Sequence, residues 1–417
     1  MKISTIKSKA LLMHGLLIAF SLLAFNISAQ DTINKSKAPE ETKKKWSDLI
    51  SIRGYFQMRY NRLFETNEDL ACEQCDRSWG KNGGFFLRRG RVIIFGNVHE
   101  RVYIYIQPDF ASSVSGTTSS GSNNYAQIRD AYFDLALDQK KQFRLRFGQS
   151  KVPFGFENLQ SSQNRIPLDR NDALNSAVSN ERDLGVFFMW APDKIRKRFS
   201  MLVNDGLKGS GDYGVIAFGA YNGQTANRSE SNNVPHIVGR VSYPFQIGNQ
   251  IFEPGIQAYA GVYTLTSDQL STGVKYRWDK TYQDNRVALS LVLAPKPLGI
   301  QAEYNVGTGP QFDKLSDSIV QKELRGGYAT ISYLINIKNQ VLIPFVRGQH
   351  YQGGKKFETD ARSYDVFEYE IGAEWQPIKN FEFVAMYTFS ERRYEDFKKQ
   401  DNLQKGQLLR LQAQFNF

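Results

Sequence analysis

The feature that most constrains the fold of this chain is an alternation of apolar and polar side chains from residue 50 to the C-terminus. It runs in segments of about ten residues, separated by turn-rich stretches. In 142–148, for example, the odd positions carry Phe or Leu, and the even positions carry Gln, Arg or Gly. Side chains of a β-strand point alternately to opposite faces, so each segment has one apolar and one polar face. Helix-period segments are hard to find, and the pattern predicts an all-β fold.

The ends of the apolar faces indicate what surrounds them. A water-soluble β-sandwich would show the same alternation, so the period alone does not identify the solvent. Aromatic residues, however, recur at the ends of the apolar faces, where outer-membrane barrels carry interfacial girdles: Phe367, Tyr369, Trp375, Phe381, Tyr387 and Phe389. We therefore expect residues 50–417 to form a transmembrane antiparallel β-barrel in the outer membrane of a Gram-negative bacterium.

Hydropathy fits a barrel better than a bundle of membrane helices. Several runs of about 20 apolar residues would be needed for such a bundle, and only one run, at the N-terminus, approaches that length. The mean hydropathy is −0.45, as expected if half of each strand faces water. The 21 Tyr and 29 Phe argue against a disordered chain.

The N-terminal apolar run reads as an export signal. Lys2, Lys7 and Lys9 precede an apolar stretch over 10–25, and small or polar residues lead to Ala29. We expect cleavage after Ala29, which makes 1–29 a signal peptide. An uncleaved anchor helix is the alternative, and a lipoprotein is not expected because no Cys follows the apolar run.

The next segment, 30–49, is charged and almost free of apolar residues, and we expect a flexible periplasmic tail. Its run of three lysines, 43–45, could serve as a nucleic-acid patch. In an exported chain, a solvated or phospholipid-facing run is the better interpretation, so no nucleic-acid partner is expected.

Strand counting gives seventeen candidate segments, whereas a bacterial single-chain barrel should have an even number. Long and short connections alternate along the chain if 195–204 is not a wall strand, which leaves sixteen strands. The pattern then assigns no role to residues 192–211, for which an oversized inner turn is one reading. Sixteen strands leave room for an aqueous channel. The expected long connections are 62–84, 112–124, 150–182, 223–234, 266–284, 307–325, 352–364 and 392–406.

Residues 85–190 contain three stretches that resemble a known family: 86–92 (FLRRGRV) with Gly96, 130–134 (DAYFD) and 146–157 (RFGQSKVPFGFE). Ser161, Ser162, Arg170 and 181–186 (ERDLGV) follow in the same order. Together they resemble the phosphate-selective porin O and P family, and the signal peptide with Gln30 is similar to its Bacteroidetes branch.

This resemblance implies a homotrimer of sixteen-stranded channels, each with its third external loop folded into the lumen. Here that loop is 150–182, the longest connection. A rigid turn packed on the inner wall is the alternative for 151–156. The last strand ends in Phe417 and resembles those that the bacterial barrel-assembly machinery recognises.

The alternation of odd and even positions along each strand places many arginines on its polar face. Arg suits phosphate because its planar fork donates two parallel hydrogen bonds and stays charged. The candidate anion-binding residues are Arg53, Arg59, Arg89, Arg91, Arg144, Arg146, Lys151, Arg165, Arg170, Arg240 and Arg410. The alternative for each arginine is pairing with a carboxylate such as Asp109, Asp130 or Asp134.

The same parity places an opposing acidic arc on the polar face: Glu303, Glu368, Glu370, Glu374 and Glu382. We therefore expect a passive porin for small hydrophilic solutes, with some preference for anions such as phosphate. Its lumen should carry both basic and acidic residues and not be uniformly basic.

Other chemistry is not expected. His99, His236 and His350 are far apart in sequence and have no metal-ligand spacing, so neither metal nor cofactor is predicted. No Ser lies within two residues of them, although folding could create the dyad of an outer-membrane hydrolase. A barrel that binds a surface partner through its loops is the other rival. Cys72 and Cys75 (C-x-x-C) are interpreted as a local disulfide.

Overall fold

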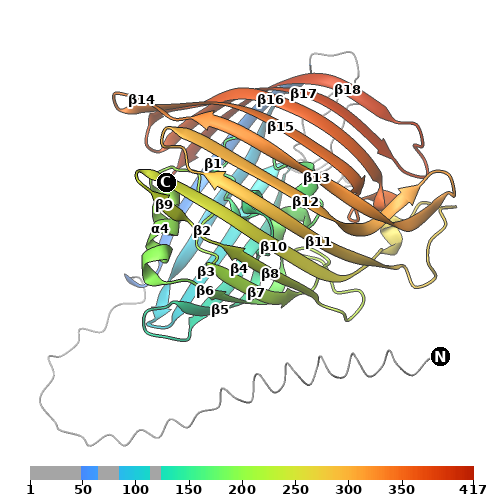
Figure 1. Cartoon of the computed structure of the whole chain (residues 1–417), viewed down its shortest axis with the longest axis horizontal. Coiled ribbons are helices and arrows are strands. Elements are labelled where there is room, and N and C mark those ends of the chain that lie inside the picture. The colour runs from blue at the N-terminus through green and yellow to red at the C-terminus, as the bar shows by residue number, and fades with distance from the viewer. Residues whose placement is uncertain (1–47, 64–83, 113–123) are drawn as a thin grey trace, which may run out of the picture. The chain divides into compact units, whose positions relative to one another are not determined.

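The wall of the molecule is one closed antiparallel sheet (Figure 1). The computed structural model describes residues 48–63, 84–112 and 124–417. Its strands are β1 (Ser51–Leu63), β2 (Gly84–His99), β3 (Val102–Ser112), β4 (Asn124–Ala136), β5 (Phe143–Lys151), β6 (Arg182–Trp190), β7 (Ile216–Tyr221), β8 (His236–Ser242), β9 (Phe245–Ile247), β10 (Gln250–Thr264), β11 (Thr281–Leu293), β12 (Leu298–Asp313), β13 (Ser318–Tyr333), β14 (Ile335–Ile337), β15 (Gln340–Gly354), β16 (Ser363–Ile378), β17 (Phe381–Glu395) and β18 (Leu403–Asn416).

These strand segments make a sixteen-stranded wall in the described part of the chain. β8 and β9 both pair with β10, so they are two pieces of one wall strand, interrupted at Pro244, which has no N–H to donate. β13 and β14 both pair with β15 and likewise form one strand. β1 pairs with both β2 and β18, which closes the ring. The predicted sixteen-stranded antiparallel barrel is confirmed.

Closure and alternation explain why this sequence suits a bilayer. Every wall strand has two hydrogen-bonded neighbours, so backbone polar groups are satisfied within the sheet. In β8, Ile237 and Val241 are exposed on the outer face, while Arg240 and Ser242 are buried inside. The outer face also exposes the predicted aromatic residues Phe367, Tyr369, Trp375 and Phe389. Among the described residues, no helix has the length and apolar character needed to span a bilayer.

The two ends of the barrel differ. We call the end where β1 begins and β18 finishes the terminal end, and the opposite end the loop end. Most connections at the terminal end are short, as predicted. At the loop end, the expected long connection 307–325 is wrong, because β12 and β13 continue as a hairpin and leave only 314–317 as a turn. Phe312, Ile319 and Leu324 are buried in this stretch, but apolar and polar side chains do not alternate along it, although backbone pairing continues.

Residues 192–211 contain a helix that the alternation did not predict. α4 (Asp193–Asn204) follows β6 at the terminal end and buries Ile195, Phe199 and Leu202. These three residues are spaced four and three apart, which puts them on one helical face. They pack against residues near the ends of β6, β7 and β10. Figure 1 shows α4 beside β9.

Candidate channel lumen

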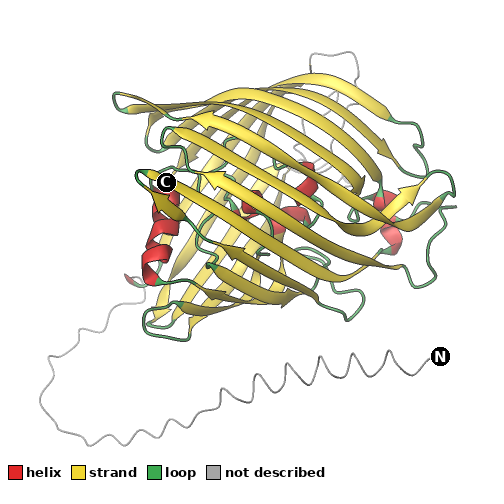
Figure 2. Cartoon of the chain, viewed as in Figure 1, coloured by secondary structure: helices red, strands yellow, loops and turns green. Residues whose placement is uncertain are grey.

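The connection between β5 and β6 folds into the barrel. We call residues 152–181 the inner loop; it contains α2 (Phe156–Leu159), α3 (Asp172–Asn175) and η2 (Ser179–Glu181). These short helices are visible behind the front strands in Figure 2. Contacts with inward-facing side chains of β1, β11, β12, β15, β17 and β18 place this loop across the lumen.

The start of the inner loop is fixed by a carboxylate from the wall. Glu303 of β12 accepts hydrogen bonds from the backbone N–H groups of Phe156 (2.6 Å) and Glu157 (2.7 Å) and from the Tyr328 hydroxyl (2.7 Å). Gly155 precedes them with φ of 82°, a conformation that favours glycine. The glycine therefore allows the turn that points these N–H groups at the wall.

Buried ion pairs anchor the rest of the loop. Asp169 pairs with Arg59 of β1 (3.2 Å) and with Arg410 of β18. Asp172 pairs with Arg392 of β17 (2.7 Å) and with Lys355. Burial alone would raise the pKa of both aspartates, but the facing cations outweigh it and hold each pKa below its usual value. Both carboxylates therefore stay ionised in the lumen.

An apolar cluster fills one side of the lumen. Phe154, Ala173, Leu174 and Val178 of the inner loop are buried in it. They pack against inward-facing residues of the wall from β6 to β17: Phe187, Tyr221, Val238, Tyr259, Ala288, Leu324, Tyr351, Tyr364, Val366 and Tyr394. This half of the barrel is packed like a protein core and leaves little room for solute.

A second segment enters the lumen from the terminal end. We call this segment, residues 205–215, which follow α4, the inner turn. The Lys208 ammonium reaches Glu374 of β16 at 2.6 Å, with both side chains buried. The Lys208 carbonyl accepts a hydrogen bond from Gln160 of the inner loop (2.6 Å). Burial would lower the pKa of Lys208, but Glu374 and Glu382 outweigh this effect and raise it. This inner turn and the inner loop therefore meet inside the barrel.

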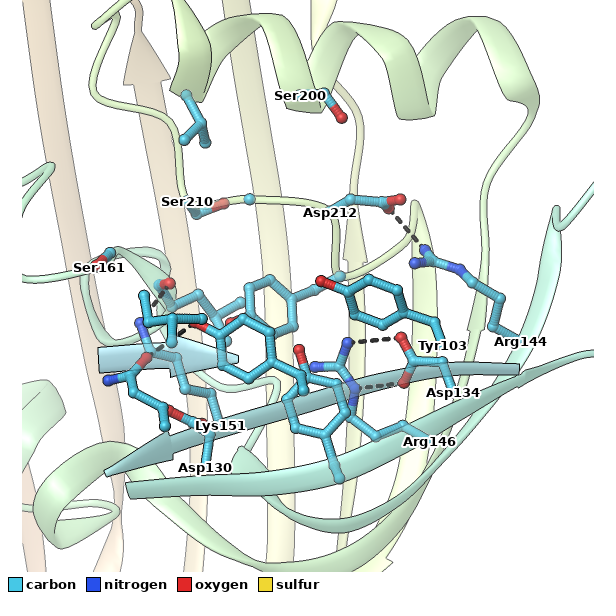
Figure 3. Close-up of a pocket in the computed structure, with 18 of the residues that line it drawn as sticks. Tyr103, Asp130, Asp134, Arg144, Arg146, Lys151, Ser161, Ser200, Ser210 and Asp212 are labelled. Atoms are coloured by element: carbon cyan, nitrogen blue, oxygen red, sulfur yellow. Dashed lines mark hydrogen bonds and ion pairs between the residues drawn. The ribbon is translucent and has the colours of Figure 1, made fainter. Parts of the chain in front are cut away.

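Between these segments and the inner face of β1–β5 lies a cavity of about 500 Å³ (Figure 3). Eight basic side chains line it: Arg53, Arg101, Lys141, Arg144, Arg146, Lys151, Arg182 and Arg196. Only three acidic side chains do so: Asp130, Asp134 and Asp212. The cavity is therefore basic.

Pairing within the cavity is incomplete. Arg146 donates two hydrogen bonds to Asp134, at 2.7 and 2.9 Å, which neutralises that pair. Arg144 and Arg196 share Asp212, at 2.7 and 2.8 Å, so one positive charge is left over. The Lys151 ammonium donates to two backbone carbonyls at 2.7 Å each, those of residues 159 and 160.

The family model for phosphate-selective porin O and P matches residues 67–417. The chain belongs to this family. No curated protein sequence matches the porin. The barrel and the family membership together support an outer-membrane channel rather than an enzyme.

Solved structures share the fold of the porin at low sequence identity. The outer-membrane channel DcaP of Acinetobacter baumannii has 14% identity and a TM-score of 0.55, over 88% of this chain and 97% of that one. OmpF of Salmonella typhi, in complex with daunomycin, has 11% identity and a TM-score of 0.54, over 88% and 97%. The trimer form of OmpT of Vibrio cholerae has 10% identity and a TM-score of 0.50, over 88% and 99%.

The predicted basic residues fall into two groups. Arg53, Arg144, Arg146 and Lys151 line the cavity. The others contact protein groups elsewhere: Arg59 and Arg410 hold Asp169, Arg89 and Arg91 hold Asp109, Arg170 holds Glu181, Arg240 holds Glu253, and Arg165 donates to the Leu168 carbonyl. All members of this second group except Arg165 therefore pair with a carboxylate, which was the alternative to anion binding.

Three of the five glutamates in the predicted acidic arc pair with a cation, and the other two accept hydrogen bonds from neutral groups. Glu368 pairs with Arg392 (2.5 Å), Glu370 with Arg347 (3.2 Å) and Glu374 with Lys208, while Glu303 accepts backbone N–H groups and Glu382 accepts from Asn416 (3.2 Å). Local pairing weakens any transverse field across the lumen.

Sequence reasoning missed the aromatic part of the cavity and one of its three acidic residues. Tyr103, Tyr105, Tyr132, Tyr213 and Asp212 all line it. Parity along β3 and β4 could have placed the first three on the inner face. Cys72 and Cys75, as well as the signal peptide, lie outside the described residues.

The three histidines of the described residues contact groups other than serine. His236 is buried beside Asp284 (3.3 Å), His350 lies near Asp365 (3.6 Å), and the Nδ1 of His99 accepts from the backbone of Arg101. Within the described ranges, no serine hydroxyl bonds to any of these rings, and no group of three His, Cys, Asp or Glu side chains could hold a metal ion.

Proposed function

We propose that the porin conducts small hydrophilic solutes passively through the outer membrane, with a preference for anions such as phosphate. The observation that carries this proposal is the basic cavity between the inner loop and β1–β5. Its excess of cations raises the local concentration of anions. The driving force is the concentration gradient of the solute.

The chemistry of the cavity suits passage rather than tight capture. Arg146 and Arg144 already bind carboxylates, so an entering anion competes for their N–H groups instead of finding bare cations. Conduction requires contacts strong enough to replace part of the hydration shell and weak enough to release the ion. Partly compensated arginines meet both conditions.

Reversal potentials in planar bilayers test this proposal. Across a KCl gradient, the purified porin should show a chloride permeability above that of potassium, and the ratio should fall at high salt, where the Debye length is short. Cation preference, or silent bilayers, would refute the proposal.

A charge-reversal pair sharpens the test. Arg53→Glu places an acid in the cavity and should lower the anion preference. The matched control is Arg325→Glu, since Arg325 is exposed on the outer face of β13, where it contacts Gln352 (3.1 Å). An equal effect of both substitutions would show that the cavity does not set the selectivity.

We further propose export through a cleaved signal peptide, 1–29, followed by a periplasmic tail, 30–49. The terminal end of the barrel then faces the periplasm, and the barrel-assembly machinery would engage the last strand with its Phe417. A homotrimer is the proposed assembly; its support is the family membership and a fold shared with OmpT, whose solved structure is described as a trimer form.

A further inference from the structure

One wall of the cavity is aromatic. Tyr105 of β3 stacks on Tyr132 of β4, with ring centroids 5.1 Å apart and an interplanar angle of 13°. The guanidinium carbon of Arg146 lies 3.8 Å from the centroid of Tyr132 and 5.6 Å from that of Tyr213. Tyr103 completes this wall, and Figure 3 shows its ring close to Asp134 and Arg146.

Three of these four hydroxyl groups lack a hydrogen-bond partner in the described part of the protein. The Tyr105 hydroxyl donates to Gln107 (2.9 Å). In the described part of the chain, the hydroxyls of Tyr103, Tyr132 and Tyr213 make no hydrogen bond to protein, and none of them is among the fully buried polar groups. A phenol both donates and accepts a hydrogen bond. The cavity therefore presents ring faces and hydroxyl partners together with its cations.

Inorganic phosphate uses only part of this lining. It matches guanidinium and ammonium groups, but it has no ring face to place against tyrosine. A volume of about 500 Å³ falls in the range of pockets that enclose organic ligands. A sugar ring offers apolar C–H faces for aromatic side chains and hydroxyls for the phenols and for Asp134. An anionic substituent on that ring would meet the positive charge that Arg144 and Arg196 leave uncompensated where they share Asp212.

We propose that this cavity is a binding site for a sugar ring that carries a carboxylate or a phosphate group. The inference rests on the proposed porin function and narrows its solute class. The tyrosines select the ring, and the basic side chains select the charge. A neutral sugar has no charge for the basic side chains to bind, and inorganic phosphate has no ring for the tyrosines to contact.

Block of the single-channel KCl current tests the inference. The probes are glucuronate, glucose 6-phosphate, glucose and inorganic phosphate, added to the full-length mature porin in planar bilayers. We expect at least one of the two sugar anions to bind about tenfold more tightly than glucose and inorganic phosphate. Block by glucuronate alone would assign a carboxylate, and block by glucose 6-phosphate alone a phosphate.

Tyrosine variants show whether the aromatic wall is responsible. Tyr103→Leu with Tyr213→Leu should weaken sugar-anion block about tenfold and leave phosphate block unchanged. The control Tyr304→Leu replaces an outward-facing tyrosine of β12 that is 50% exposed. It should alter neither the block by sugar anions nor the block by phosphate. Should the double variant fail to fold, Tyr103→Phe with Tyr213→Phe removes the hydroxyls alone and should still weaken sugar-anion block.

The outcomes separate the two proposals. If chloride is preferred over potassium but the sugar anions bind no better than phosphate, or the tyrosine variants do not weaken their block, the inference is overturned and the porin function stands. If no anion preference is measured, the proposed function itself fails.

Discussion

At the scale of residues, most charged side chains inside this barrel hold protein segments together. Periodicity correctly placed Arg59 and Arg410 on the inner face, but their shared partner is Asp169, which is 241 residues from Arg410 in sequence. A strand pattern predicts which face a side chain occupies. It contains no information about which loop residue will meet that side chain, because the path of the loop is set by many tertiary contacts at once.

The anchoring carboxylates have a defined pH dependence. Asp169 and Asp172 have pKa values below those of an unfolded chain, near 3.9, so their stabilisation is present above about pH 4. It is lost as the pH falls through the lower, folded-state pKa. We expect steady single-channel currents from pH 7 to pH 5. At pH 7, Asp172→Asn should destabilise the anchored loop by about 3 kcal/mol and produce stepwise current fluctuations, because Lys355 loses its closest buried partner and keeps only a longer contact with Glu358, at 3.8 Å.

Asp193→Asn is the matched control for this prediction. It removes an ion pair with Lys197 on the surface of α4, where the two side chains are 50% and 77% exposed. Exposed pairs of this spacing contribute little to stability, because water and salt screen them. Steady currents from Asp172→Asn, or equal noise from both variants, would mean that the buried pair does not hold the inner loop.

At the scale of elements, the wall was predictable and the segments inside it were not. Alternation located every wall strand, since one face of each strand meets lipid. The alternation also marks 195–204, within α4, as a strand candidate, although Ile195, Phe199 and Leu202 have helical spacing. The inner turn, 205–215, lies away from lipid and carries no alternation. Its position depends on contacts such as that between Lys208 and Glu374.

The inner turn should limit conductance. Lys208→Met leaves Glu374 buried without its cation, which costs about 3 kcal/mol and favours withdrawal of the turn from the lumen. We expect a higher single-channel conductance for this variant than for the parent porin. Adding Glu374→Met should restore the parent conductance, because replacing both members of a buried pair with apolar residues is often neutral. An unchanged conductance in Lys208→Met would show that the turn does not narrow the path.

At the scale of the whole molecule, the barrel is a closed ring that depends on one seam, where β18 meets β1. Residues Gly54 and Phe417 exchange backbone hydrogen bonds of 2.9 and 3.0 Å, and the Phe417 ring stacks on Phe56 with centroids 5.8 Å apart. A side chain at Gly54 has no space, since an added Cβ would lie 2.3 Å from the Arg91 carbonyl oxygen and 2.5 Å from the Phe417 ring. The last residue of the chain therefore covers a glycine on the first strand.

This seam predicts unequal effects of two glycine substitutions. Gly54→Val should prevent closure, because the backbone oxygen of β2 cannot yield without breaking the sheet. Gly239→Val, on β8, should be tolerated, since an added Cβ there meets no atom within 4 Å. Phe417→Ala should cost only about 1 kcal/mol, the contribution of one aromatic pair. Heat-modifiable electrophoretic mobility of each variant measures the folded fraction, and urea unfolding measures the smaller loss. Equal folding of the two valine variants would contradict a sterically demanding seam at Gly54.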